Sequence, residues 1–131
     1  MTTRTASCSC GQLTATTSED PIRVSLCHCL ACQRRTGSVF GAQARFRSEA
    51  VVIKGESKLY VRTGDEGSKT AFNFCPSCGA TVHFGLEGRE GSVVIPVGAF
   101  AEQGFPRPTF SVYEERKHAW VNLPENIEHM A

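Results

Sequence analysis

The sequence predicts a mainly β fold, with short antiparallel strands and one short helical turn. Short runs of β-branched and aromatic residues recur along the chain, and Gly-rich turn signals separate them. Only one segment has the pattern of a helix. At 131 residues the chain is long enough to bury a hydrophobic core, so we expect residues 1–131 to form a single domain.

The clearest predicted strand covers residues 40–46, where Phe40, Ala42, Ala44 and Phe46 alternate with polar or small residues. This alternation is typical of a strand with one buried face. Turn signals at residues 64–67 and 85–88 predict two hairpins. The other expected strands are residues 13–15, 23–26, 51–54, 59–62, 70–74, 81–84 and 92–97.

The helical turn is expected over residues 30–36, because Gly37 can adopt the left-handed conformation that ends a helix. Residues 99–110 contain Pro106 and Pro108, which restrict the backbone of their neighbours. We expect an irregular segment there that crosses the molecule.

The composition argues against several classes of partner. Charged residues make up 21% of the chain and the formal net charge is +1, so no strong field attracts nucleic acid or an anionic membrane. The longest apolar stretch, residues 93–101, is too short for a membrane span. The first ten residues contain no apolar signal region. We expect a cytoplasmic protein whose thiols stay reduced, with no nucleic-acid or membrane partner.

Seven cysteines need an explanation, because an odd number cannot all form intramolecular disulfides. Cys75-Pro-Ser-Cys78 followed by Gly79 is the pattern of a zinc knuckle, which supplies half of a tetrahedral site. Cys8 and Cys10 can supply the other half, so the four together predict a closed, structural zinc site. Alternatively, Cys8 and Cys10 are spare thiols near the N-terminus.

Cys27, Cys29 and Cys32 lie within six residues and can fill three positions of a second zinc site. Structural zinc sites are closed, whereas catalytic ones usually keep one position for water or substrate. We expect two Zn²⁺ per chain, with the second bound more weakly and prone to loss or oxidation. The alternative is a second closed site with a histidine as fourth ligand. An extended strand would point His28 away, which leaves His83, His118 and His129.

Arg34 and Arg35 directly follow the three-cysteine group. They could offset the negative charge of the thiolates, hold an anionic ligand, or form a solvated basic face.

The cysteine pattern resembles one known family. The run Cys27-His-Cys-Leu-Ala-Cys-Gln-Arg-Arg-Thr-Gly37, with Cys8-x-Cys10 before it and Cys75-Pro-Ser-Cys78 after it, is similar to the glutathione-dependent formaldehyde-activating enzymes, which include centromere protein V. The resemblance implies a β-tent fold, in which zinc joins β-sheets. It also implies a structural zinc at Cys8, Cys10, Cys75 and Cys78, and a catalytic zinc at Cys27, Cys29 and Cys32.

The activity implied by this resemblance is the addition of glutathione to formaldehyde, which gives S-hydroxymethylglutathione. The reverse reaction cleaves a carbon–sulfur bond, as a carbon–sulfur lyase does. The expected partners are therefore a small thiol and a small carbonyl compound. Two other functions compete with this one: a non-catalytic binding module stabilised by zinc, and a thiol redox or metal-sensing protein.

Overall fold

The computed structural model describes residues 2–130, which form two β-sheets and one α-helix. The smaller sheet has three strands in the order β1-β2-β5. Its strands are β1 (Arg4–Ser7), β2 (Thr14–Thr17) and β5 (Val51–Lys54). Both pairings in this sheet are antiparallel.

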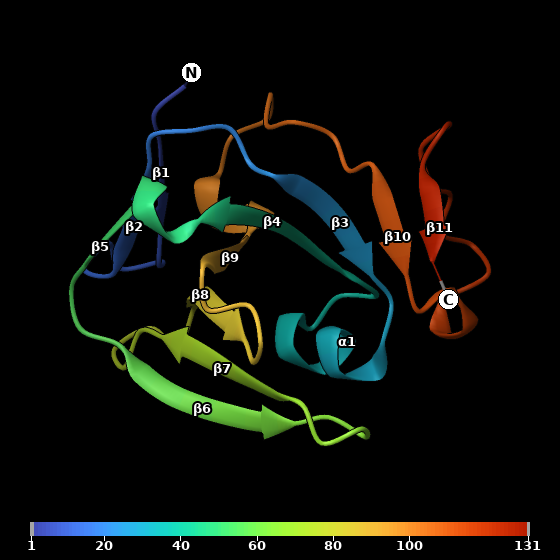
Figure 1. Ribbon diagram of the computed structural model, residues 1–131, viewed down its shortest axis with the longest axis horizontal. Helices are drawn as coiled ribbons and strands as arrows, with labels where there is room; N and C mark the ends of the chain where they lie inside the picture. Colours follow the sequence, from blue (N-terminus) through green and yellow to red (C-terminus); the bar gives the residue numbers. More distant parts are fainter. Residues whose placement is uncertain (1, 131) are drawn as a thin grey trace.

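The larger sheet has eight strands in the order β11-β10-β3-β4-β9-β8-β7-β6. Its strands are β3 (Arg23–Cys27), β4 (Gly41–Arg47), β6 (Lys58–Thr63), β7 (Lys69–Phe74), β8 (Thr81–Leu86), β9 (Ser92–Pro96), β10 (Phe110–Val112) and β11 (Glu128–Met130). Figure 1 shows that this sheet bends strongly, with α1 (Leu30–Thr36) inside the bend. The helix lies between β3 and β4 on one side and β6 and β7 on the other.

The mainly β class and the single α-helix are confirmed among the described residues. The helix begins after Cys29 and ends at Thr36, where Gly37 adopts a φ of 71° and donates its backbone N–H to the carbonyl of Gln33. Strand β4 buries Ala44 and Phe46 completely, as the alternation predicts. Three short 3-10 turns complete the regular structure: η1 (Ser48–Ala50), η2 (Val97–Phe100) and η3 (Glu114–Arg116).

The predicted antiparallel strands make up most of the larger sheet, but one edge of that sheet is parallel. Strand β10 pairs in parallel with both β3 and β11. Residues 101–109 carry the chain from β9 past β4 and β3 to the position of β10, and residues 113–127 connect β10 to its parallel neighbour β11. The predicted turn at residues 85–88 is also shifted. Strand β8 continues through Leu86 because Gly85 and Leu86 still pair with β7, so the turn to β9 comes later.

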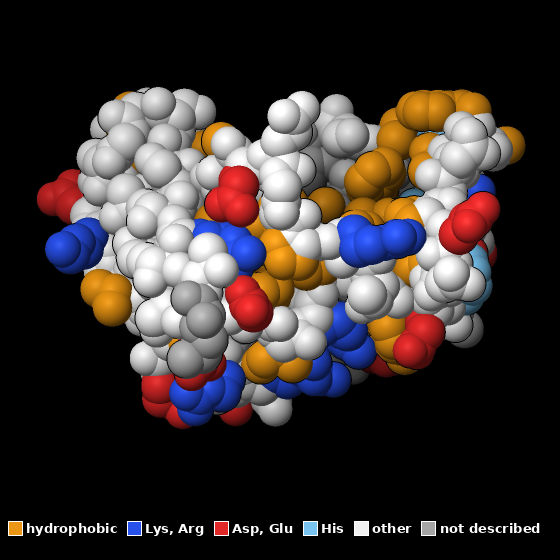
Figure 2. All heavy atoms as spheres, turned by 90° about the horizontal axis from the view of Figure 1, so that it is seen from above, with side chains coloured by type: hydrophobic (Ala, Val, Ile, Leu, Met, Phe, Trp, Pro, Cys, Tyr) orange, Lys and Arg blue, Asp and Glu red, His pale blue; other side chains and the backbone are white. Residues whose placement is uncertain are grey.

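The hydrophobic core lies between the two sheets. Ala15 of β2 and Leu13, which directly precedes that strand, form a cluster with residues of the large sheet that include Phe46, Val82 and Ile95, and all five are completely buried. Burial of such side chains removes apolar surface from water, which is the main favourable term in folding. No helix in residues 2–130 has the length and apolar character required to cross a bilayer. Figure 2 shows that acidic and basic side chains are interspersed on the face seen from above, with hydrophobic ones between them.

Candidate metal centres

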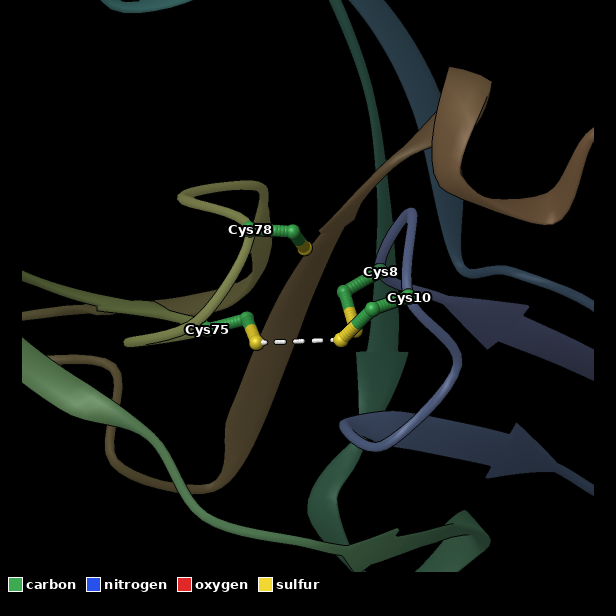
Figure 3. A group of neighbouring side chains, drawn as sticks. All are labelled: Cys8, Cys10, Cys75 and Cys78. Carbon is green, nitrogen blue, oxygen red and sulfur yellow. Dashed lines mark hydrogen bonds between the residues drawn. The ribbon is translucent and has the colours of Figure 1, made fainter.

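The first cysteine group joins two segments that lie far apart in the sequence. Cys8 and Cys10 lie in the loop after β1, which is closed by a hydrogen bond from the Cys8 N–H to the Leu13 carbonyl. Cys75 and Cys78 lie in the turn between β7 and β8. The Cys75 carbonyl accepts a hydrogen bond from the Gly79 N–H over 2.8 Å, which closes that turn. Figure 3 shows that the four thiols point toward one another from these two segments.

The spacing of these four sulfurs fits a shared metal ion. All four Sγ atoms lie within 4.8 Å of one another. The Cys8–Cys10 and Cys10–Cys75 Sγ–Sγ distances are 3.7 and 3.6 Å, much longer than a disulfide bond of about 2.05 Å. Four sulfurs in a tetrahedron at about 2.3 Å from zinc are about 3.8 Å apart. The structure thus brings together the four residues predicted as one site.

The second cysteine group surrounds the start of α1. Cys27 is the last residue of β3, Cys29 is the N-cap of α1, and Cys32 lies in its first turn. The Sγ of Cys29 accepts a hydrogen bond from the backbone N–H of Cys32 over 3.3 Å, which fixes the start of the helix. The three Sγ atoms lie within 4.8 Å of one another, and Cys27 and Cys29 are 3.4 Å apart. The three predicted residues therefore also form one cluster.

Hydrogen bonding gives each cluster a thiol that ionises readily. Hydrogen bonds from the Cys27 and Cys32 thiols lower the pKa of Cys29 to about 2. The same interactions, together with burial, raise the pKa of Cys27. In the other cluster, a hydrogen bond from the Gln12 amide lowers the pKa of Cys75 to about 6. Thiolates are the form of cysteine that binds metal, so each cluster is suited to hold a metal cation.

Comparison with known proteins gives a family match and a solved structure of similar fold. The family model described as "Glutathione-dependent formaldehyde-activating enzyme" matches residues 3–116, which is most of the chain. The chain belongs to this family. Among solved structures, a Rhodobacter sphaeroides protein shares the fold with a TM-score of 0.56 and 18% identity, over 78% of this chain and 90% of the other. A comparison with curated protein sequences gives no match.

In this member of the glutathione-dependent formaldehyde-activating family, histidines do not complete either cluster. No histidine, aspartate or glutamate of residues 2–130 lies close enough to join the sulfurs. The buried His28 pairs through Nε2 with the Ser111 hydroxyl over 3.0 Å, and His118 pairs with Gln33. His129 lies against Glu114, and His83 is partly buried in β8. The histidine-closed alternative therefore has no support in the described residues.

The two arginines after Cys32 have different surroundings in this family member. Arg34 is exposed, whereas Arg35 turns into the bend of the large sheet. The guanidinium carbon of Arg35 lies 4.9 Å from the ring centre of Phe84 and 5.6 Å from that of Phe72. A Cβ atom placed on Gly41 would lie 3.1 Å from Nη2 of Arg35 and 3.7 Å from Sγ of Cys32. Arg35 is therefore a neighbour of the three-cysteine cluster.

Gln12 is a site residue that the sequence analysis missed. Its Nε2 donates to Sγ of Cys75 over 3.0 Å and to the Glu56 carbonyl over 2.7 Å. Its Oε1 accepts from the Glu56 N–H over 2.9 Å. These partners lie 44 and 63 residues away in the chain, so no local pattern could have revealed them. Gln12 orients a ligand of the first cluster, as residues around metal sites commonly do.

Proposed function

We propose that this protein forms or breaks a carbon–sulfur bond between a small thiol and a small aldehyde, at a zinc ion held by Cys27, Cys29 and Cys32. One observation carries the proposal: these three sulfurs converge, and no further ligand from residues 2–130 joins them. Zinc sites with three protein ligands usually keep a fourth position for water or substrate. The family description names glutathione and formaldehyde, so these are the first substrates to test.

The reaction balances without an oxidant or reductant. The thiol sulfur forms a bond to the carbonyl carbon, and the thiol proton ends on the carbonyl oxygen, which gives a hemithioacetal (an S-hydroxymethyl adduct when the aldehyde is formaldehyde). When bound, zinc would favour the thiolate form of the substrate or polarise the aldehyde. The chain itself holds three sulfurs on the end of a strand and the start of a helix. Arg35 adds a positive charge beside Cys32, which offsets part of the thiolate charge.

The four-cysteine cluster has a different proposed role. Its four sulfurs lie close enough to hold one ion, and together they would fill a tetrahedral site and leave no position for a substrate. We assign it a second zinc ion that joins the small sheet to the turn between β7 and β8. All seven cysteines are free thiols. Thiols stay reduced and available to metal in the cytoplasm, which is where we place this protein and its single domain.

A thiol redox role is the second candidate, and the low pKa of Cys29 favours it. Without metal, the Cys29 thiolate lies 3.4 Å from the Cys27 sulfur. Hydrogen peroxide could oxidise this pair to a disulfide with release of two water molecules. This role predicts that the three-cysteine cluster is free of metal in the active protein, whereas the enzyme role predicts that it holds a metal ion.

The test replaces zinc with Co²⁺ and follows the visible spectrum while glutathione is added. We expect bands of the second site to shift as the thiol binds, and Cys29→Ser to abolish that shift. In the zinc protein, exchange of ¹³C-formaldehyde with its glutathione adduct should be faster than in buffer, and Cys29→Ser should remove the acceleration. An unchanged cobalt spectrum together with uncatalysed exchange would refute the proposal.

A further inference from the structure

Strand β6 forms one edge of the large sheet and is the longest of the edge strands in residues 2–130. It pairs with β7 on one side only, and Figure 1 shows its other side at the border of the molecule. Three consecutive apolar residues in the strand, Leu59, Tyr60 and Val61, are 58%, 59% and 45% exposed. An edge of this kind readily pairs with another strand, and most proteins therefore shorten, bend or cover it.

The backbone groups on the open side of β6 follow from the hairpin that this strand forms with β7. The N–H of Gly64 donates to the carbonyl of Ser68, so this pair closes the hairpin. Because hydrogen-bonded pairs alternate along an antiparallel ladder, Tyr60 and Arg62 also bond to β7. The N–H and C=O groups of the alternate residues point outward, namely those of Leu59, Val61 and Thr63.

We propose that this edge binds the β6 edge of a second copy of the chain, so that the two large sheets join across a two-fold axis into one antiparallel sheet. Such an axis requires one residue to face its own counterpart. With Val61 at the axis, all three outward-pointing residues form hydrogen bonds, and Leu59 faces Thr63 of the second copy. An axis at Leu59 or Thr63 would instead carry the partner beyond the ends of the strand.

The charges of β6 favour this register over the neighbouring one. With Tyr60 at the axis, Lys58 would lie opposite Arg62 of the second copy, and like charges directly opposite one another are destabilising. With Val61 at the axis, Arg62 lies opposite Tyr60 of the second copy, whose ring attracts a cation to its face. Basic residues on an edge strand commonly prevent pairing, but in this register those of the two copies do not meet.

The same register brings opposite charges together at both ends of the joined strands. Lys58 lies opposite Gly64 of the second copy, and Asp65 and Glu66 follow Gly64 at the tip of the hairpin. All three charged side chains are exposed, and they take no part in the ion pairs of residues 2–130. A strand from an unrelated protein would need this charge spacing by chance, whereas a second copy supplies it by symmetry.

Apolar side chains of the edge also gain cover in the pair. Val61 lies opposite Ala71, which lies opposite Gly85, so these three residues form one row on the same face. A shallow hollow beside this row is lined by Val61 and Val93 among others. In the proposed register, Val61 of the second copy extends the row, with Leu59 next to it. Removal of this apolar surface from water favours association.

The first experiment measures the mass of the zinc protein by sedimentation over a range of concentrations, and we expect a reversible dimer. Lys58→Glu and Asp65→Lys should each weaken it about tenfold, because like charges then meet at both exposed ends. An equal mixture of these two variants should regain the parental affinity, since opposite charges meet again. Arg116→Glu, at an exposed residue of η3, should keep the dimer. A monomer at every concentration, or a mixture that regains nothing, would overturn the proposal.

The second experiment locates the interface by hydrogen exchange of the backbone amides, followed by NMR. In the dimer, the amides of Leu59, Val61 and Thr63 should exchange slowly, and dilution to the monomer should make them fast. Those of Tyr60 and Arg62 should stay protected in both states, which establishes that β6 remains folded. Val61→Pro removes an outward N–H and no bond to β7, so it should abolish the dimer. Fast exchange at the outward amides of a dimeric protein would overturn the proposal.

Discussion

The side-chain amide of Gln12 donates a hydrogen bond to Sγ of Cys75 over 3.0 Å, while the same amide pairs with both backbone groups of Glu56. A ligand of the four-cysteine cluster is thereby tied to the connection between β5 and β6. The cluster thus joins three segments: the loop after β1, the turn after β7 and the connection before β6.

Gln12→Ala should weaken metal binding at the four-cysteine cluster. It removes a donor that stabilises the Cys75 thiolate and leaves the Glu56 backbone groups unpaired. Residues around metal ligands typically change affinity by about 10- to 100-fold, and we expect a loss in that range. Competition with a chelating dye measures it. Gln103→Ala, at an exposed glutamine, is the matched control, and an equal effect in both variants would contradict the role of Gln12.

Gly55→Ala should be far more disruptive than a glycine substitution at an ordinary turn. Gly55 has a φ of 101°, and a Cβ atom there would lie only 1.9 Å from the carbonyl oxygen of Gln12. Gly67 has a similar φ of 88° but open space around its Cβ position. We expect Gly67→Ala to cost roughly 1–2 kcal/mol of the free energy of unfolding, from backbone strain alone.

Gly55→Ala adds a collision with backbone, so the cost should exceed about 3 kcal/mol, and the four-cysteine cluster should bind metal less tightly. Urea unfolding of both variants, with metal analysis of each, makes the comparison. Similar stabilities for the two variants would show that the Gln12 loop can move away at little cost.

Serine substitutions should separate the two clusters. Cys29→Ser should lower the metal content by one ion per chain. It should leave the fold intact, because the three-cysteine cluster lies at the start of one short helix. Cys75→Ser should lose the other ion and destabilise the whole domain, since structural zinc contributes directly to folding. Metal analysis by mass spectrometry and thermal unfolding are the measurements. A Cys75→Ser protein as stable as the parent would refute the structural role of the four-cysteine cluster.

His83 should make the protein less stable in acid. Burial lowers the pKa of His83 from its ordinary value of 6.5, so the unfolded chain binds this proton more readily than the folded protein does. Below about pH 6.5, unfolding therefore takes up a proton, and the free energy of unfolding falls as the pH falls. His83→Gln should make that pH dependence shallower, and His118→Gln, at an exposed histidine, should not.

Urea unfolding between roughly pH 5 and 7 in the presence of zinc measures this difference. Loss of metal in acid affects every variant, so the comparison between His83→Gln and His118→Gln isolates the histidine. Identical slopes in the two variants would show that His83 does not control acid stability.

The sequence predicted those features that depend on neighbours in the chain. Alternation identified the buried face of β4, and Gly37 marked the end of α1, because both effects act within a few residues. The sulfurs lie in the two groups that the sequence predicted. Local spacing explains the three-cysteine group, whereas the four-cysteine group was predicted because each of two distant pairs supplies half of a tetrahedral site. The parallel position of β10 was missed because it depends on where a long connection returns. Gln12 was missed for the same reason, because its partners come from distant segments.

The distinct roles of Arg34 and Arg35 also required the structure. Adjacent helical positions point in directions about 100° apart, and only the packing of α1 against Phe84 shows which arginine is turned inward. From the sequence, Arg34 and Arg35 were equally possible partners of the thiolates, because both follow Cys32 closely.

The two cysteine clusters differ in how far apart their members lie along the chain, and this difference sets an order during synthesis. Translation delivers Cys27, Cys29 and Cys32 almost together, whereas Cys8 and Cys10 must wait until Cys78 has left the ribosome. All three ligands of the three-cysteine cluster are therefore available to bind a metal ion before all four ligands of the four-cysteine cluster have been synthesised. We expect the three-cysteine cluster to bind the first metal ion. Metal binding at the four-cysteine cluster should come later, and it should fix the smaller sheet in place.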